Sequence, residues 1–303
     1  MELRSREDLR RQLRGGLQAD VADKGGYLVK GELFAELINA EALASVMRRI
    51  CRVIPPITGD SLPVPSQDAL LSDATWTNEL GTGSDDTSTP FGRRTLHPHP
   101  LVKRIRVSSK LLRTAPNADA VVIDMMTAAA AAVEECAFLQ GDGVGQPLGV
   151  LNTPDLAVVT TAASAALDAD SVRHWLYSLP SRFYGGSTRV VTTADFLRHL
   201  LALKDAGGHY VFDDYNGNLL GIPVSLTDGL PAVVDGSDAL IGGAYAALIG
   251  DWRWFWIGDG IDAGLVQSTE LYVETNEVGY FYRRSVDGLA VIASAFCALQ
   301  IKA

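Results

Sequence analysis

The sequence has few of the features that mark a secreted, membrane-spanning or catalytic protein. Its three cysteines, Cys51, Cys136 and Cys297, are far apart and set among apolar neighbours, which favours buried, reduced thiols over disulfides. No apolar run reaches the ~18 residues that a helix needs to cross a bilayer. The N-terminus, MELRSREDLRRQLR, is charged throughout and does not resemble a secretory signal. These absences predict a cytosolic protein.

Catalytic motifs are also missing. The chain contains no HExxH, GxSxG or CxxC pattern. His97 and His99 could share a metal ion, but no cysteine or acid lies near them in the sequence, and Pro98 and Pro100 favour an edge strand. We therefore expect no catalytic residue, no cofactor, no metal ion and no enzymatic activity.

Two consecutive stretches each lack one sign of charge. Between Val53 and Gly92 there are six acids and no Lys or Arg, whereas between Thr87 and Ala118 there are seven bases and no acid. The stretches are either complementary surfaces or ordinary solvated faces, and the sharp segregation favours the first. The net charge of −10 argues against a nucleic-acid-binding module, which normally carries a basic excess.

The longest helical pattern runs from Asn117 to Gln140 and ends in the glycine-rich stretch GDGVGQP. Apolar residues at spacings of four and three predict one buried helix face. These residues are Val122, Met126, Ala129, Val133 and Cys136. Asn117 or Asp119 can cap the start, and Gly141 is expected to end the helix in a left-handed turn. We interpret the glycines as a tight turn, because a single acid, Asp142, cannot form a calcium loop and a phosphate loop precedes its helix.

The part of the chain before this helix predicts extended structure. Prolines exclude a helix between Arg52 and Pro65. Residues Trp76 to Val107 then predict a long hairpin, with a first strand, the tip GTGSDDTSTPFG and a return strand. An isolated two-stranded ribbon is only marginally stable in water. Since this ribbon has few large apolar residues, we expect it to lie on another molecule.

After the long helix the pattern alternates between helices and strands. Helices are predicted over Asp170–Leu179 and Ala194–Lys204, and strands over Thr188–Thr193, HYVF, GIPVSL, ALIGGAYAALIGDW, Leu271–Thr275, Tyr280–Val286 and Leu289–Leu299. In WRWFWI, Trp252, Trp254 and Trp256 are expected on one face of a strand, where they could stack on a sugar or a base. Packing in a core or a subunit seam is favoured, because this part of the chain is acidic.

The order of these landmarks resembles that of the major capsid proteins of tailed double-stranded DNA phages, which share the Hong Kong-97 capsid fold. The matching landmarks, in order, are GGYLV (Gly25–Val29), W-x-x-E (Trp76–Glu79), a charged return strand (Lys103–Arg113), the long helix (Asn117–Gln140) and GDGVGQPLG (Gly141–Gly149). The stretches LKDAGGHYVF, LLGIPV, IGDW and RRSVDGLAVIASAFCAL also resemble the family. No single motif decides the resemblance; the ordered set carries it, over roughly residues 25–300.

The resemblance implies an α+β fold with a peripheral domain built on a long spine helix, an axial α/β domain, an extended β-hairpin loop and an N-terminal arm. The implied bounds are 1–26 for the arm, 27–75, 108–151 and 271–303 for the peripheral domain, 76–107 for the loop and 152–270 for the axial domain. The extended loop would reach over a neighbouring subunit. Its expected contact residues are Trp76, Glu79, Asp85, Asp86, Phe91, Arg93, Arg94 and Arg104.

The function implied by the resemblance is that of a major capsid protein. Hexamers and pentamers would form the icosahedral shell of a virion around packaged double-stranded DNA, without sequence-specific DNA binding. Assembly would take place in the host bacterial cytoplasm, without a membrane, and the expected partners are a scaffold, a portal and decoration proteins. Some family members cross-link through a loop lysine, but residues 76–102 contain none. Only 24 residues precede GGYLV, which favours a separate scaffold over a removed segment.

Two alternatives stay open. The same fold could form a gene-transfer particle or an encapsulin-like nanocompartment. The alternative from another class is an acidic, cytosolic carbohydrate-active enzyme that uses the Trp252–Trp256 platform. A small oligomer that binds glycans would favour this enzyme, whereas a megadalton particle would favour a shell.

Overall fold

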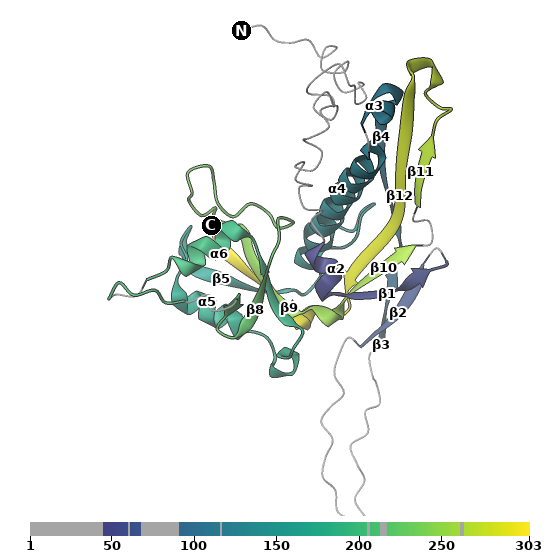
Figure 1. Cartoon of the computed structure of the whole chain (residues 1–303). Coiled ribbons are helices and arrows are strands. Elements are labelled where there is room, and N and C mark those ends of the chain that lie inside the picture. The colour runs from purple at the N-terminus through teal and green to yellow at the C-terminus, as the bar shows by residue number, and fades with distance from the viewer. Residues whose placement is uncertain are drawn as a thin grey trace, which may run out of the picture. The chain divides into compact units, whose positions relative to one another are not determined.

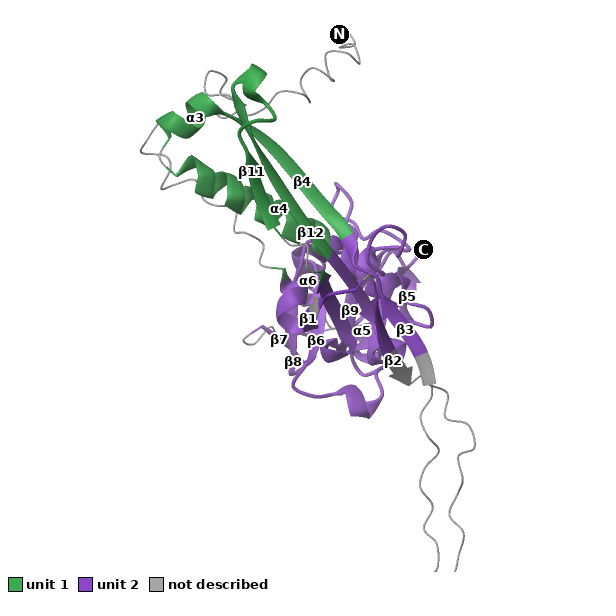
Figure 2. Cartoon of the chain, turned by 90° about the vertical axis from the view of Figure 1, so that its right-hand side faces the viewer, with its two compact units in different colours: residues 1–45, 100–134, 260–285 green, residues 46–99, 135–259, 286–303 purple. Residues whose placement is uncertain are grey.

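The computed structural model describes residues 45–59, 61–67, 91–115, 117–204, 207–212, 217–260 and 264–303. The chain divides into two compact units (Figure 2). Unit 1 contains residues 1–45, 100–134 and 260–285, and unit 2 contains residues 46–99, 135–259 and 286–303. Two long elements, α4 (Ala118–Gln140) and β12 (Glu277–Ala290), contribute residues to both units. The predicted arm and the GGYLV run lie outside the described residues.

The larger sheet of unit 2 has six strands in the order β5-β13-β9-β6-β8-β7. These strands are β5 (Ala157–Ser164), β6 (Thr188–Thr192), β7 (Asn218–Leu219), β8 (Ile222–Leu226), β9 (Tyr245–Asp251) and β13 (Phe296–Lys302). β13 runs parallel to β5 and antiparallel to β9. Because side chains alternate across a strand, Val190 and Ile249 pack in one layer, and Val191 and Leu248 pack in the other.

Two short helices form the first of these layers. α5 (Ala169–Leu176) follows Asp168, whose carboxylate accepts a hydrogen bond from a first-turn backbone N–H at 2.8 Å. α6 (Ala194–Leu201) follows Thr193, whose hydroxyl accepts the equivalent bond at 3.3 Å. Such caps satisfy backbone donors that the helix itself leaves free. The apolar faces of both helices then bury Trp175 and other side chains against the sheet.

The second layer combines the last turns of α4 with aromatic residues near β10 (Phe255–Gly260). The ring of Phe138 lies edge-on to that of Phe255, with centroids 5.9 Å apart. Trp252 lies edge-on to Phe296 at 5.3 Å. All four rings are fully buried, so the end of α4 is a core element of unit 2.

Unit 2 also contains shorter ladders. α2 (Val46–Ile50) precedes β1 (Arg52–Ile57), which pairs with β10. β10 in turn pairs antiparallel with the last residues of β12, with Phe255 opposite Ala290. β2 (Leu62–Gln67) and β3 (Phe91–Leu96) form a separate antiparallel ribbon. Both strands between Arg52 and Pro65 confirm the predicted extended structure.

Unit 1 is built from β4 (His99–Ser108), α3 (Ser109–Thr114), the first turns of α4, β11 (Gly264–Ser268) and the first residues of β12. β12 pairs with β11 and with β4. Figure 1 shows α4 running alongside β4 and β12, and the buried core between them contains Val107, Leu111, Val122, Met126 and Tyr280. None of the described helices is both long and apolar enough to span a membrane.

The long helix is confirmed, but its buried face differs from the prediction. Val122 and Met126 are buried, whereas Val133 is 55% exposed. The two acids that follow it, Glu134 and Glu135, are buried instead. Apolar spacing failed here because these carboxylates have partners: Glu135 accepts a hydrogen bond from the backbone N–H of Val46 at 3.1 Å.

The tight turn after α4 is confirmed, although the role of Gly141 is not the predicted one. Positive φ values occur at Gly143 (78°) and Gly145 (69°), inside the turn, and not at Gly141. A side chain at Gly141 would collide with the backbone oxygen of Pro147, so close approach of the chain requires this glycine. The carboxylate of Asp142 accepts a hydrogen bond from the backbone N–H of the second residue along, at 2.9 Å, which stabilises the turn.

Three predicted strands are wrong. HYVF forms only an isolated bridge at Tyr210 among its described residues, and Leu271–Thr275 contains the 3-10 helix η6 (Val273–Thr275). The run Leu289–Leu299 is broken by η7 (Ala293–Ala295), which separates β12 from β13. This last run is apolar nearly throughout because both flanking strands are buried, so hydropathy does not reveal where the chain turns.

Two strand pairings join segments to which the resemblance gives different domains. β13 falls within the range assigned to the peripheral domain, and it pairs with β5 and β9, which were assigned to the axial domain. β10 falls within the axial range, and it pairs with β1 and β12. The domain bounds stay a prediction.

Candidate assembly surfaces

The base of the predicted loop is a ribbon anchored on the core of unit 2. β2 and β3 pair in register from Leu62 opposite Leu96 to Gln67 opposite Phe91. Val64 and Leu96 are buried together with Ile54 and other apolar residues. The paired part of the ribbon is therefore fixed to the core of unit 2.

The two consecutive arginines of β3 have different roles. Arg94 is partly buried, and its Nη1 donates a hydrogen bond to the backbone oxygen of Ala290 at 2.9 Å. Arg93, whose side chain alternates to the other face, is exposed and has no acidic partner among the residues that the structure describes. Arg94 therefore anchors the ribbon, and Arg93 is the arginine available to a second molecule.

A buried carboxylate, which the sequence analysis missed, fixes the turn after β3. Asp287 accepts hydrogen bonds from the backbone N–H groups of His97, at 2.6 Å, and Gly288, at 2.8 Å. Burial raises the pKa of Asp287, and the two backbone hydrogen bonds partly offset this rise. His97 and His99 lie beside this acid, so the turn after β3 that contains them has a structural role. The sequence carried no signal for the contact, since 190 residues separate its partners.

The basic residues of β4, in unit 1, also include one that is bound within the fold and others that are exposed. Arg106 forms an ion pair with Glu277 at 3.3 Å and lies over the ring of Tyr272 at 5.5 Å. Lys103 and Arg104 are exposed and have no acidic partner within the described part of the chain. Exposed bases that have no acidic partner in the described structure are available for contact with an acidic surface.

The structure describes only some of the predicted contact residues. Trp76, Glu79, Asp85 and Asp86 lie outside the described residues, and Phe91 is the first residue of β3. Arg93 and Arg94 belong to unit 2, and Arg104 belongs to unit 1. Contact between these residues and a neighbouring subunit therefore stays a prediction.

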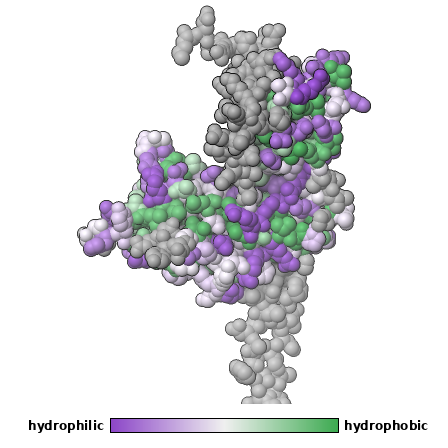
Figure 3. Space-filling model, viewed as in Figure 1, coloured by the Kyte–Doolittle hydropathy of each residue, from purple (hydrophilic) through white to green (hydrophobic). Residues whose placement is uncertain are grey.

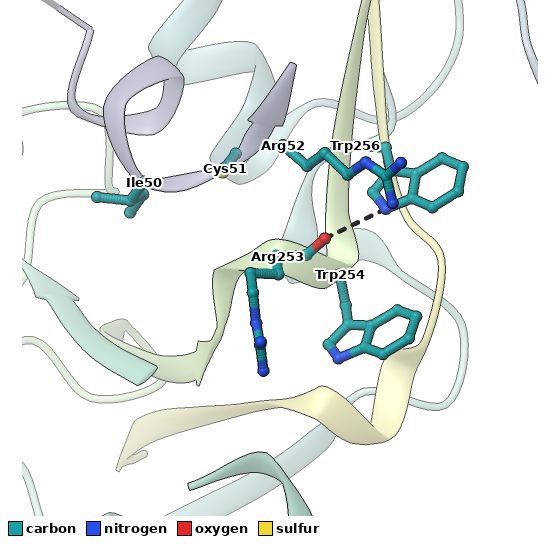
Figure 4. A pocket seen from close by; sticks show the side chains of 6 residues that line it. All are labelled: Ile50, Cys51, Arg52, Arg253, Trp254 and Trp256. Carbon is teal, nitrogen blue, oxygen red and sulfur yellow. Dashed lines mark hydrogen bonds between the residues drawn. The ribbon is translucent and has the colours of Figure 1, made fainter. Parts of the chain in front are cut away.

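The tryptophan stretch does not form the predicted strand face. Trp252–Trp254 is a 3-10 helix, and β10 begins only at Phe255. Trp252 is fully buried, and its indole N–H donates to the backbone oxygen of Arg189 at 3.0 Å, which confirms core packing for this residue. Trp254 and Trp256 are partly exposed and line a hollow (Figure 4). In the described residues no group of His, Cys, Asp or Glu is placed to hold a metal ion.

Comparisons with known proteins agree on one kind of molecule. The model of the phage capsid family matches residues 25–301. The capsid of a native GTA particle is 21% identical, with a TM-score of 0.74, over 86% of this chain and 91% of that one. The corresponding chain of Mycobacterium phage Adephagia is 14% identical, with a TM-score of 0.64, over 100% and 99% of the two chains. A chain of the satellite phage P4 procapsid that includes size determination (Sid) protein is 13% identical, with a TM-score of 0.55, over 89% and 100%. No curated protein matches.

Proposed function

Since the chain belongs to the phage capsid family and is a major capsid protein of the virion, we propose that its copies assemble into hexamers and pentamers of an icosahedral shell. The shell encloses packaged double-stranded DNA. A chain with a net charge of −10 suits a container that does not rely on affinity for DNA, because DNA binding normally uses a basic excess. In this proposal the helix α4 serves as the spine of a peripheral part, and the six-stranded sheet belongs to an axial part.

The extended loop, residues 76–107, makes the contact between subunits. The observation that supports this role is the charge at its base: Arg93, Lys103 and Arg104 are exposed and have no acidic partner among the described residues. The same loop carries Glu79 just before its tip and Asp85 and Asp86 within the tip. Copies that exchange loops would bring these opposite charges together, which sets register and partner choice.

Deletion of the loop tip tests this role. Replacing residues 81–90 by a short Gly-Ser turn leaves β3, which begins at Phe91, intact. We expect no shells by light scattering and negative-stain microscopy, with unchanged circular dichroism and tryptophan fluorescence of the subunit. A matched control replaces the same residues by a Gly-Ser segment of equal length, which keeps the reach and removes the charges. Normal shells from the short-turn variant would show that the loop does not make the contact.

The partners of the shell follow from the same proposal. A scaffold, a portal and decoration proteins are expected, and assembly takes place in the cytoplasm of the host bacterium. The likeness to a procapsid that includes a size determination protein supports an assembly partner of this kind. Co-expression with the neighbouring genes of the same source tests this point, since shells would form only when a scaffold is present.

A shell with other contents is the second candidate. The likeness to the capsid of a GTA particle favours a gene-transfer particle in part. Extraction of nucleic acid from purified particles separates the two functions, because a phage head holds one defined genome and a gene-transfer particle holds unrelated fragments.

A further inference from the structure

Unit 2 contains a hollow of about 320 Å³ that is lined in part by two indole rings. Its lining residues are Ile50, Cys51, Arg52, Arg253, Trp254 and Trp256. Figure 4 shows the guanidinium of Arg52 lying against the indole of Trp256, and the distance to the ring centroid is 4.6 Å. The indole N–H of Trp256 donates to the backbone oxygen of Arg253 at 3.2 Å, so this ring is held in place.

The hollow offers hydrogen-bond donors and positive charge. Arg52 has no acidic partner among the described residues, and the indole N–H of Trp254 has no acceptor there. Arg253 is neutralised by Asp251, at 3.0 and 2.6 Å, but its side chain is 62% exposed. Burial raises the pKa of the Cys51 thiol well above its ordinary value, so this residue adds no negative charge. These groups suit a ligand that has carboxylates and a small apolar side chain.

We infer that the hollow binds the acidic limb of the extended loop from a second copy, residues Glu79–Asp86 (ELGTGSDD). This segment carries three carboxylates, and it belongs to the stretch between Val53 and Gly92 that contains no Lys or Arg. Leu80 supplies the apolar side chain for the indoles, and the carboxylates meet Arg52 and the N–H of Trp254. Desolvated charge pairs beside aromatic rings give both affinity and partner choice. The inference rests on the proposed role of the loop in subunit contact.

A charge exchange tests the pairing in the full-length protein. Arg52→Glu should lower the yield of shells about tenfold, and so should the double variant Asp85→Arg with Asp86→Arg, because each places like charges together. Combining the two sets should restore the yield to within about threefold of wild type, since the pair is then re-formed with opposite sign. A combined variant no better than either parent would overturn the inference.

Arg49→Glu is the matched control. Arg49 is an exposed base of α2 that does not line the hollow, and it differs from Arg52 by three positions in the chain. It should leave the yield within about twofold of wild type, because an exposed charge with no partner in the described part of the chain contributes little. Equal losses from Arg49→Glu and Arg52→Glu would mean that only the overall charge of this surface matters.

A binding measurement removes the dependence on variants that fold poorly. A fluorescent peptide of residues 76–89 is titrated into unassembled subunits whose own residues 81–90 have been replaced by the short turn. Fluorescence anisotropy should show binding that weakens between 50 and 500 mM salt, as expected for screened charges. The milder changes Arg52→Gln and Trp254→Phe should each raise the Kd about fivefold. Absence of binding, or Kd values unchanged by both variants, would overturn the inference.

The two proposals fail separately. Normal shells after replacement of residues 81–90 would remove the proposed function of the loop together with this inference. Loss of shells in that experiment, with no restoration by the charge exchange, would leave the loop as the contact and show that it binds elsewhere on the neighbour.

Discussion

The two units differ in how much of their apolar surface they cover themselves. Unit 2 fills both faces of its six-stranded sheet, one with α5 and α6 and the other with α4 and buried aromatic rings. Unit 1 buries a smaller cluster around Val122 and Tyr280. It leaves Val266, Leu271 and Val273 exposed at 62%, 61% and 68%, and Figure 3 shows hydrophobic next to hydrophilic side chains on its surface.

The buried carboxylates of both units have partners within the described residues. In unit 2, Glu135 and Asp287 accept hydrogen bonds from backbone N–H groups, and Asp251 pairs with Arg253 at 2.6 Å. In unit 1, Glu277 pairs with Arg106 at 3.3 Å, and Glu134 faces Arg284 at 3.6 Å. A buried carboxylate that loses its partner carries a large desolvation cost, so such contacts fix both units. The difference between the units therefore lies in their exposed apolar side chains.

From this comparison of the two units, we expect the largest loss of stability when a residue in the core of unit 2 is replaced. Phe138→Ala removes a fully buried ring that contacts Phe255, and should lower the free energy of unfolding by about 3–5 kcal/mol, since a cavity remains. Urea denaturation of unassembled subunits measures this change. Tryptophan fluorescence reports it selectively, because every described tryptophan lies in unit 2, and Trp76→Phe removes the remaining one.

Met125→Ala is the control on the same helix. Met125 belongs to unit 1 and is 53% exposed, so its removal should change the free energy of unfolding by less than ~0.5 kcal/mol. If both substitutions have equal effects, unit 2 does not depend on its own core more than unit 1 depends on its exposed surface.

Local patterns predicted the elements of the fold better than their packing. The helices α4, α5 and α6 and the strands β6 and β8 lie where apolar spacing and polar caps placed them. Burial of Glu134 and Glu135 could not be predicted, because their partners come from distant segments. The same cause explains β13: its apolar sequence predicts burial, but nothing local specifies pairing with β5 and β9. The family could be predicted from the ordered landmarks, because each landmark is a local feature of the sequence.

A smaller effect should appear in the pH dependence of unit 2. Burial raises the pKa of Asp287 above the ordinary 3.8, so the folded protein binds this proton more tightly than the unfolded chain. The stability that the group contributes is therefore complete below pH 3.8 and is lost as the pH rises through the folded-state pKa. Asp287→Asn cannot titrate. The free energy of unfolding of the variant minus that of wild type should therefore increase over this range and then level off. Two parallel curves would contradict the raised pKa.

The contact residues were predicted from the extended loop that the family resemblance implies, and the described ones differ in their surroundings. The sequence could not distinguish Arg93 from Arg94, because the difference arises from alternation across β3 and from the backbone oxygen of Ala290. Nor could it show Arg52 and Trp256 lining one hollow, since 204 positions separate them. The acidic residues of the loop, from Glu79 to Asp86, carried the clearest sequence signal, yet they lie outside the described residues. For that reason, their role is tested by measuring the assembly of shells.

The smallest effect on stability is expected at the edge of unit 1. β11 is the last strand in its sheet order, so one edge of its backbone is unpaired among the described strands, and it carries neither a charge nor a proline that would discourage pairing. Val266→Ser should leave the free energy of unfolding within ~0.5 kcal/mol of wild type, because the side chain is already exposed, and should lower shell yield about threefold if another copy covers it. Val144→Ser, in the turn after α4 in unit 2 and 80% exposed, is the matched control. It should change neither quantity, because this residue lies on no strand. Equal yields from the two variants would show that unit 1 leaves this surface to solvent, and the contrast between the units would then concern their cores alone.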